Sequence, residues 1–248
     1  TPLYSSAASD VYKRQVLLGD VNNYRSPLLS FTGAAELPDA TSTLIDAAGV
    51  PSHYGDPLRE QRFVQRGGVA VDRSHRSVIR VAGPDAAEFL NNLLSQKLDD
   101  APDGYSAAFC DLDIQGHILH HGDITRAGDT FYLDTPSYLG ESLLEYLTKM
   151  IFWSEVTVDK ADLGIITVLG APSSFAVPES TGAVFSREVD WAGPRRIDIA
   201  VPRAQLADAY RALTSADAGL EKAGLMAFTA ERVKALEPVS YTHLRAHE

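Results

Sequence analysis

The chain has 248 residues, 45% of them hydrophobic, which is enough for the core of one large domain or two small ones, and its formal net charge is −11. An acidic chain without a long basic run is a poor candidate for general nucleic-acid binding or for binding to anionic membranes. Its single cysteine, Cys110, excludes an intrachain disulfide framework and a multi-cysteine metal cage.

Both ends of the chain lack apolar periodicity. Residues 1–15 and 239–248 look like translated adaptor or vector sequence, so we expect non-native or disordered tails there. No apolar run reaches the length of a membrane span, and no charged-then-apolar signal segment opens the chain. We therefore expect a cytoplasmic protein without a membrane partner.

Residues 16–62 are predicted to form an N-terminal arm. Prolines at 27, 38, 51 and 57 interrupt it repeatedly, so we expect extended chain with at most a short helix near residues 41–47. Asp56 can then cap a helix that begins at Pro57 and ends near Gln65, because proline is tolerated at the first helical position.

Residues 63–160 are predicted to form a first α+β sub-domain. Branched residues predict strands at 69–72 and 77–82, and an apolar stripe predicts a helix over 86–95. A hairpin follows over 105–126, with its turn at Asp113–Gly116, because Asp can bond to its own backbone and Gly tolerates positive φ. A strand at 130–134, a helix over 136–150 and a strand at 153–158 complete this part.

Residues 161–238 are predicted to form a second α+β sub-domain. An apolar run at 163–169 is typical of a strand buried on both sides, and residues 196–201 alternate as a strand does. A weak strand at 183–186 and helices over 203–213 and 227–236 accompany them. The order of elements predicts an α+β protein with two linked mixed sheets, each with helices on one face.

Three histidines lie close together on the second strand of the hairpin. Strand alternation places His117, His121 and Asp123 on one face and His120 on the other. Three ligands on one face could hold zinc, but nothing in the sequence indicates the surrounding support that a metal site needs. We predict half-exposed histidines and no metal.

Other polar residues give weaker signals. Arg73 and Arg76, in the polar run at 72–76, could clamp a carboxylate, although a solvated loop is the favoured interpretation because charged loops lie mostly at the surface. Cys110 follows Phe109 in a strand and is expected to be an unreactive core side chain. The sequence contains no G-x-S-x-G, G-x-G-x-x-G or P-loop motif, so acyl-enzyme chemistry has no support from it.

Five segments stand in the order found in one family: HYGDP at 53–57, VDRSHRSVIRVAGPDAAEFLNNLLSQ at 71–96, DLDIQGHI at 111–118, TFYLDTPSYLGESLLEYLTKMIFWSEVTV at 130–158 and GLMAFTAERV at 224–233. Over about residues 54–236 the chain thus resembles the folate-binding YgfZ family, relatives of the T-protein (aminomethyltransferase) of the glycine cleavage system. The resemblance implies a GcvT-like folate-binding fold, with two linked ferredoxin-like sub-domains around a central cavity for tetrahydrofolate.

The resemblance also implies a function. It indicates a non-catalytic or weakly catalytic protein that binds tetrahydrofolate and supports iron–sulfur cluster assembly or repair in client proteins, and tRNA modification. No catalytic residue is implied, and the implied folate-binding residues are Asn92, Asp113, Gly116, His120, His121 and Arg232. The family's cysteine-bearing segment, K-G-C-Y-x-G-Q-E, would follow the last predicted helix, so we expect the chain to be truncated at its C-terminus.

Two departures from the related T-protein bear on activity. His120 and His121 stand where the T-protein carries an Asp-Asp pair, which argues against aminomethyl transfer because a carboxylate would orient the folate nitrogen. Thr229 replaces an acidic residue of the last helix, whereas Arg232 is kept and could pair with the folate glutamate or simply be an exposed helix charge. Two alternatives stay open: a tetrahydrofolate-dependent aminomethyltransferase, and a protein-interaction module without folate.

Overall fold

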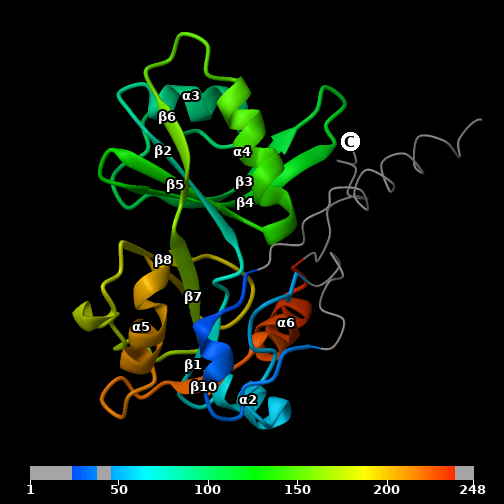
Figure 1. The fold of residues 1–248 in the computed structure, drawn as a ribbon, viewed down its shortest axis with the longest axis vertical. Helices are drawn as coiled ribbons and strands as arrows, with labels where there is room; N and C mark the ends of the chain where they lie inside the picture. The colour runs from blue at the N-terminus through cyan, green and yellow to red at the C-terminus, as the bar shows by residue number, and fades with distance from the viewer. Residues whose placement is uncertain (1–23, 38–45, 238–248) are drawn as a thin grey trace, which may run out of the picture.

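The computed structural model describes residues 24–37 and 46–237, which fold into two five-stranded sheets with flanking helices (Figure 1). This architecture confirms the predicted α+β class. The helix predicted near residues 41–47 falls mostly outside the described residues. Within the described ranges, no helix is long and apolar enough to span a lipid bilayer.

The first sheet has the strand order β3-β4-β5-β2-β6 and is antiparallel throughout. Helices α3 (Ala86–Leu93) and α4 (Gly140–Lys149) lie with it in the upper part of Figure 1, and their predicted apolar stripes pack into its core. The strands are β2 (Ser77–Ala82), β3 (Ser106–Leu112), β4 (Ile118–Ala127), β5 (Thr130–Thr135) and β6 (Thr157–Ala161).

The second sheet has the strand order β10-β1-β7-β9-β8 and is mixed, because β1 and β10 run parallel. Helix α5 (Leu206–Leu213) packs in one core with it, and α2 (Pro57–Val64) and α6 (Leu225–Lys234) pack in another. Both faces are therefore covered, which buries every residue of β7 as predicted. The strands are β1 (Val69–Asp72), β7 (Leu163–Leu169), β8 (Phe185–Val189), β9 (Arg196–Pro202) and β10 (Glu221–Ala223).

Two stretches of chain cross from one sheet to the other. Residues 73–76 join β1 to β2, and Asp162 joins β6 to β7; β1 pairs with β7 and β2 with β6. The polar run at 72–76 therefore lies between the sheets, where Arg73 and Arg76 are 5% and 7% exposed. The prediction of a solvated loop was wrong because the sequence does not show that the chain changes sheet there. We predicted that the first sub-domain ends at residue 160 and the second begins at residue 161. The two sheets do not divide there, because β1, which precedes this boundary, belongs to the second sheet.

Smaller differences concern the ends of elements. The structure begins β6 at Thr157 rather than near Trp153, whose side chain is 97% exposed. The short strand β10 is absent from the sequence prediction, because three residues carry too little periodicity to be recognised. The helix predicted from Pro57 is confirmed, and the Asp56 side chain accepts the Arg59 N–H at 2.9 Å as its cap.

A buried ion network joins the two sheets. Arg187, on β8, places its Nη1 atom 2.5 Å from Asp134 Oδ1 on β5 and its Nη2 atom 3.0 Å from Asp198 Oδ2 on β9. Arg76 binds Asp134 at 2.7 Å, and Arg196 binds Asp198 at 2.7 Å. A charge removed from water requires a partner, and here Asp134 has two guanidinium groups and Asp198 has three, the third being Arg73 at 3.6 Å.

The same network determines how its acidic groups ionise. Burial opposes ionisation of Asp134, but the charges of Arg187 and Arg76 hold its pKa below the ordinary value. Burial likewise opposes ionisation of Asp198, and Arg196 and Arg187 hold its pKa well below the ordinary range. Both carboxylates are therefore negative at neutral pH, so each ion pair consists of full charges.

We predict that Arg187→Met lowers the free energy of unfolding by about 3–5 kcal/mol, because it leaves two buried carboxylates short of a partner. The midpoint of urea unfolding measures this change. Arg80→Met is the matched control: its ion pair with Asp159 is 45% and 38% exposed, so we expect a loss of about 0–1 kcal/mol. Equal losses in the two variants would contradict the assigned role of the network.

Candidate functional site

A cavity of about 240 Å³ lies between the two sheets. The first sheet contributes side chains from the hairpin, including Cys110 and His121, which are Cα partners across β3 and β4. The crossing segment contributes Arg73 and Arg76, and α6 contributes residues from the second half of the chain. Residues from both halves of the fold therefore form the wall of the cavity.

Guanidinium groups dominate one part of the wall. Arg73 lies over the Phe228 ring with its Cζ atom 4.2 Å from the ring centroid, and Arg196 and Arg232 lie at 5.3 and 5.7 Å from the same centroid. Burial, with the charges of Arg76 and Arg196, lowers the pKa of Arg73 to about 9, so this group still carries its charge at neutral pH. The wall presents clustered positive charge around an aromatic face.

Three carboxylates face these cations. Asp46 accepts the Ser137 N–H at 3.3 Å and lies 3.4 Å from Nε2 of His75. Burial would raise the pKa of Asp46, but His75, Ser137 and Arg76 together hold it below the ordinary range. Glu237 lies 3.4 Å from Nε of Arg232. The third carboxylate, Asp123, contacts guanidinium groups at 3.4, 3.6 and 3.7 Å, belonging to Arg187, Arg196 and Arg76 respectively.

His121 supplies an imidazole to this wall. Burial, with the positive charges of Arg76 and Arg232, lowers its pKa to about 4. The ring is therefore neutral at physiological pH, where one nitrogen donates a hydrogen bond and the other accepts one. A neutral ring among cations suits hydrogen bonding to a polar heterocycle better than it suits pairing with an anion.

The predicted folate-binding residues divide between the cavity and other parts of the fold. His121 and Arg232 both line the cavity. Asp113 and Gly116 lie at the hairpin tip, where the Asp113 carboxylate accepts the Gln115 and His117 N–H groups, each at 2.8 Å, and Gly116 has φ +82°. Their observed contacts therefore serve the turn.

The other two predicted residues also lie away from the cavity. Asn92 is exposed on α3. His120 points from β4 toward α4, on the opposite face from His121, because successive strand residues alternate. Of the six predicted residues, the structure thus brings together His121 and Arg232.

The prediction of half-exposed histidines was wrong for His120, which is 8% exposed because α4 covers it, whereas His121 is half-buried. His117 does not continue the face of His121 and Asp123, because the strand pairing shifts register after Asp111, and the His117 ring instead lies 2.8 Å from Asp113. No group of three or more potential metal ligands is found in the part of the chain that the structure describes. Burial and the Asp111 charge raise the pKa of Cys110, so its thiol is protonated at neutral pH.

The sequence prediction did not assign Asp46, Asp123, Arg196 and Phe228 to the site. For Arg196 a signal exists: Arg196 and Asp198 alternate with apolar residues in the strand RIDIAV, and oppositely charged side chains on one face of an otherwise apolar strand indicate a buried pair. Asp46 and Phe228 give no such signal, because only the tertiary fold brings the arm and α6 to the cavity.

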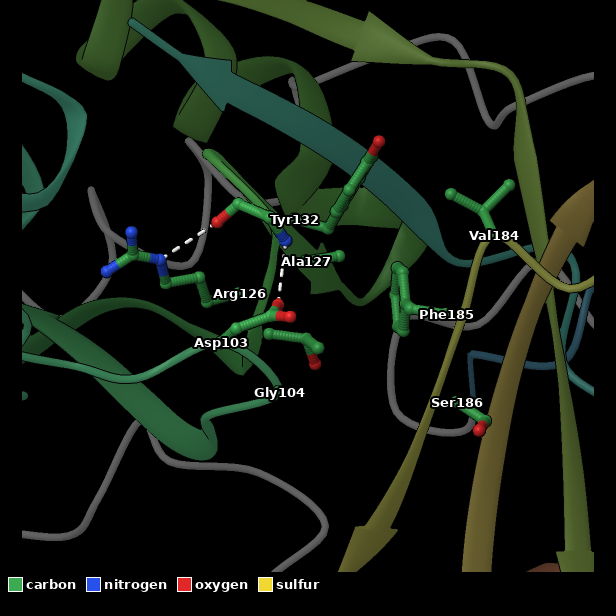
Figure 2. Close-up of a pocket in the computed structure, with 10 residues that line it drawn as sticks. Asp103, Gly104, Arg126, Ala127, Tyr132, Val184, Phe185 and Ser186 are labelled. Atoms are coloured by element: carbon green, nitrogen blue, oxygen red, sulfur yellow. Dashed lines mark hydrogen bonds between the residues drawn. The ribbon is translucent and has the colours of Figure 1, made fainter. Parts of the chain in front are cut away.

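A second, more open groove of about 510 Å³ lies elsewhere along the junction of the sheets. Tyr132 of β5 and Phe185 of β8, both drawn in Figure 2, line this groove and pack against each other with their ring centroids 5.2 Å apart. The guanidinium of Arg126 is engaged by the carbonyl oxygens of Gly128 and Ala101 at 2.9 and 2.5 Å. We assign the candidate site to the smaller cavity, where more charged groups converge.

Comparison of sequences finds curated aminomethyltransferases. The protein of Stenotrophomonas maltophilia strain R551-3 is 29% identical over 132 residues, and that of strain K279a is 28% identical over 132 residues. Each match covers 51% of this chain but 36% of the relative, so the chain aligns with only about a third of their length. No protein-family model matches the chain.

Comparison of structures finds the same fold in a solved protein. The glycine cleavage system aminomethyltransferase T from Bartonella henselae superposes with a TM-score of 0.71 at 22% sequence identity. The match covers 85% of this chain and 61% of that protein. The chain therefore has the aminomethyltransferase-like α+β fold, in agreement with the predicted fold.

We predict that His121 makes stability depend on pH in the mildly acidic range. Its pKa is about 4 in the folded protein and 6.5 ordinarily, so the unfolded chain binds the proton more readily and stability falls as pH drops through this window. Between pH 7 and pH 4.5 we expect a loss of about 2 kcal/mol from this group. Urea unfolding of the native chain and of His121→Gln at both pH values measures it. The difference in free energy of unfolding between the native chain and His121→Gln should change by that amount between the two pH values. Equal losses in the two proteins would contradict the low pKa assigned to His121.

Proposed function

We propose that the cavity between the sheets binds a reduced folate, and that the protein supports iron–sulfur cluster assembly or repair in client proteins. The observation that carries the folate proposal is the clustering of Arg73, Arg196 and Arg232 around one aromatic ring inside a cavity of an aminomethyltransferase-like fold. Folate combines a flat heterocycle with glutamate carboxylates, which are the two chemical features that this wall complements.

The lining residues fit tetrahydrofolate in their chemistry. The volume of about 240 Å³ suits the pterin bicycle. Within the described residues, Nδ1 of His75 is buried without a hydrogen-bond partner, a cost of about 1–3 kcal/mol that a polar ring edge could offset. Arg232 and Arg196 would hold the carboxylates, and His121 would bond to the heterocycle. When bound, tetrahydrofolate would supply a nitrogen that carries one-carbon units.

The side chains that face the cavity favour a role in iron–sulfur cluster maintenance over catalysis of aminomethyl transfer. His121 stands where the resemblance places a carboxylate of the T-protein, and its low pKa makes it a weak base. The iron–sulfur clients and the link to tRNA modification rest on the resemblance to the YgfZ family. Deleting the gene and restoring it as native or Arg232→Gln protein, while measuring iron–sulfur enzyme activity, tests that role.

A tetrahydrofolate-dependent aminomethyltransferase is the second candidate, and one structural observation favours it. Asp123 follows His121 by two residues on the same strand and also lines the cavity, so a carboxylate is present close to the expected position. The Asp123 carboxylate forms ion pairs with three guanidinium groups. Supplying an aminomethyl donor and tetrahydrofolate separates the candidates, because steady formation of methylenetetrahydrofolate would favour the enzyme.

We predict that tetrahydrofolate raises the melting temperature of the full chain, because a ligand that binds only the folded state stabilises it. Arg232→Gln should weaken binding of tetrahydrofolate about 10-fold or more, since a charge-assisted hydrogen bond contributes about 1.5–3 kcal/mol. The same variant should leave binding of a pterin without glutamate nearly unchanged. Calorimetric titration measures both affinities.

Arg195→Gln is the matched control, because the half-buried Arg195 pairs with the exposed Glu188 at 2.9 Å and does not line the cavity. It should bind both ligands as the native chain does. No stabilisation by tetrahydrofolate would overturn the proposal and favour the remaining alternative, a protein-interaction module without folate.

A further inference from the structure

Two side chains on the other face of the hairpin and one on α4 form a separate hydrogen-bonded row. Asp111 on β3 and His120 on β4 are Cα partners, and Asp111 Oδ2 lies 2.7 Å from Nδ1 of His120. On the far side of the ring, Nε2 of His120 lies 3.0 Å from Oγ of Ser142 on α4. The order is carboxylate, imidazole, hydroxyl, with both distances in hydrogen-bonding range.

The row is separate from the proposed folate cavity. Cys110 and His121, the neighbours of Asp111 and His120 along the strands, line the cavity, whereas the row itself lies on the side of the first sheet that α4 covers. Burial decreases along the row: the side chains of Asp111 and His120 are 2% and 10% exposed, and Ser142 is half-buried. The hydroxyl is thus the member of the row that a molecule from solvent can reach most easily.

The surroundings hold the imidazole in one orientation. The Tyr146 ring stacks on His120 with centroids 5.9 Å apart and an interplanar angle of 24°. An ionised Asp111 can only accept hydrogen bonds, so Nδ1 of the ring donates to it. In the neutral ring Nε2 then has a free lone pair, and that lone pair faces Oγ of Ser142.

The Ser142 hydroxyl has one proton and two possible acceptors. Its Oγ also lies 3.0 Å from the Leu139 carbonyl oxygen, one turn earlier in the chain. With a neutral His120 the proton can be given to Nε2, and with a protonated ring it can be given to Leu139 while Oγ accepts from the ring. The geometry therefore lets His120 take the proton when Oγ forms a new bond.

We propose that Asp111, His120 and Ser142 form a nucleophilic site in which Ser142 accepts acyl or phosphonyl groups from small activated esters. Ser142 Oγ bonds to the acyl carbon, and the bond from that carbon to the leaving oxygen breaks. The Ser142 proton passes to Nε2 of His120 and then to the leaving group, which departs as an alcohol. Asp111 keeps the ring in the required tautomer. Water, deprotonated by His120, can later release the acyl group as a carboxylic acid.

This site requires neither folate nor the cavity, so its test is independent of the proposed function. The full chain is treated with a fluorophosphonate probe, whose phosphorus bonds to the serine oxygen as fluoride leaves with the proton, and the labelled peptide is mapped by mass spectrometry. We expect labelling at Ser142 that is absent in Ser142→Ala and slower by about 10²-fold or more in His120→Gln, because a general base contributes about 10²–10⁴-fold. Asp111→Asn should also slow it.

Ser186→Ala is the matched control, since Ser186 is exposed on β8 in the second sheet and should leave the labelling rate unchanged. A second measurement does not depend on how His120 variants fold. Ser142→Cys and Ser186→Cys are alkylated with iodoacetamide in the otherwise native chain, and mass mapping separates them from Cys110. His120 should make the thiol at 142 react at least 10-fold faster than the thiol at 186. Absence of probe at Ser142, an unchanged rate in a folded His120→Gln, or equal alkylation of the two thiols would each overturn the proposal.

Discussion

Two sheets with their own apolar cores meet in this protein through a buried ion network, beside an apolar cluster in which Val78 and Tyr132 of the first sheet pack with Phe185 of the second. Asp123 and Asp134 stand directly opposite each other on β4 and β5, where two like charges would repel. Arg187 reaches them from the second sheet, and Arg76 reaches them from the segment that crosses between the sheets. The first sheet does not satisfy these groups alone, so the ion pairs that its carboxylates make with the guanidinium groups help to fix the relative position of the sheets, together with the apolar cluster that spans them.

An interface of this kind leaves a polar cavity as a natural consequence. Hydrocarbon surfaces would close against each other, whereas buried ions keep fixed positions and must be satisfied individually. Arg73, Arg196 and Arg232 gather around Phe228 because an aromatic face is one of the few apolar surfaces that attracts a cation. The charged groups that hold the sheets together thus also form the wall available to a ligand. A substitution there affects stability and binding together, which is why the binding test compares two ligands on one variant.

The fold could be predicted from the sequence where a residue pattern is local. The stripes of α3 and α4, the Asp56 cap and the strand β9 each follow from neighbouring residues, and the structure confirms them. The site could be predicted only in part. Arg73 and Arg76 look like surface charges in sequence because nothing local shows that β1 and β2 belong to different sheets. Asp46 and Phe228 meet the same cavity from segments about 180 residues apart, and no spacing in the chain encodes that contact.

The adjacent histidines of β4 show how strongly surroundings determine side-chain chemistry. Because strand residues alternate, His121 faces the cationic cavity and His120 faces α4, although the two are consecutive. Burial and positive neighbours lower the pKa of His121 and keep the ring neutral, so it can serve as a hydrogen-bonding group for a heterocycle. Asp111 and Tyr146 instead fix the orientation of His120 and point its second nitrogen at a hydroxyl. One dipeptide thereby supplies two different imidazoles, and the sequence resemblance alone, which treats the pair as a unit, does not separate them.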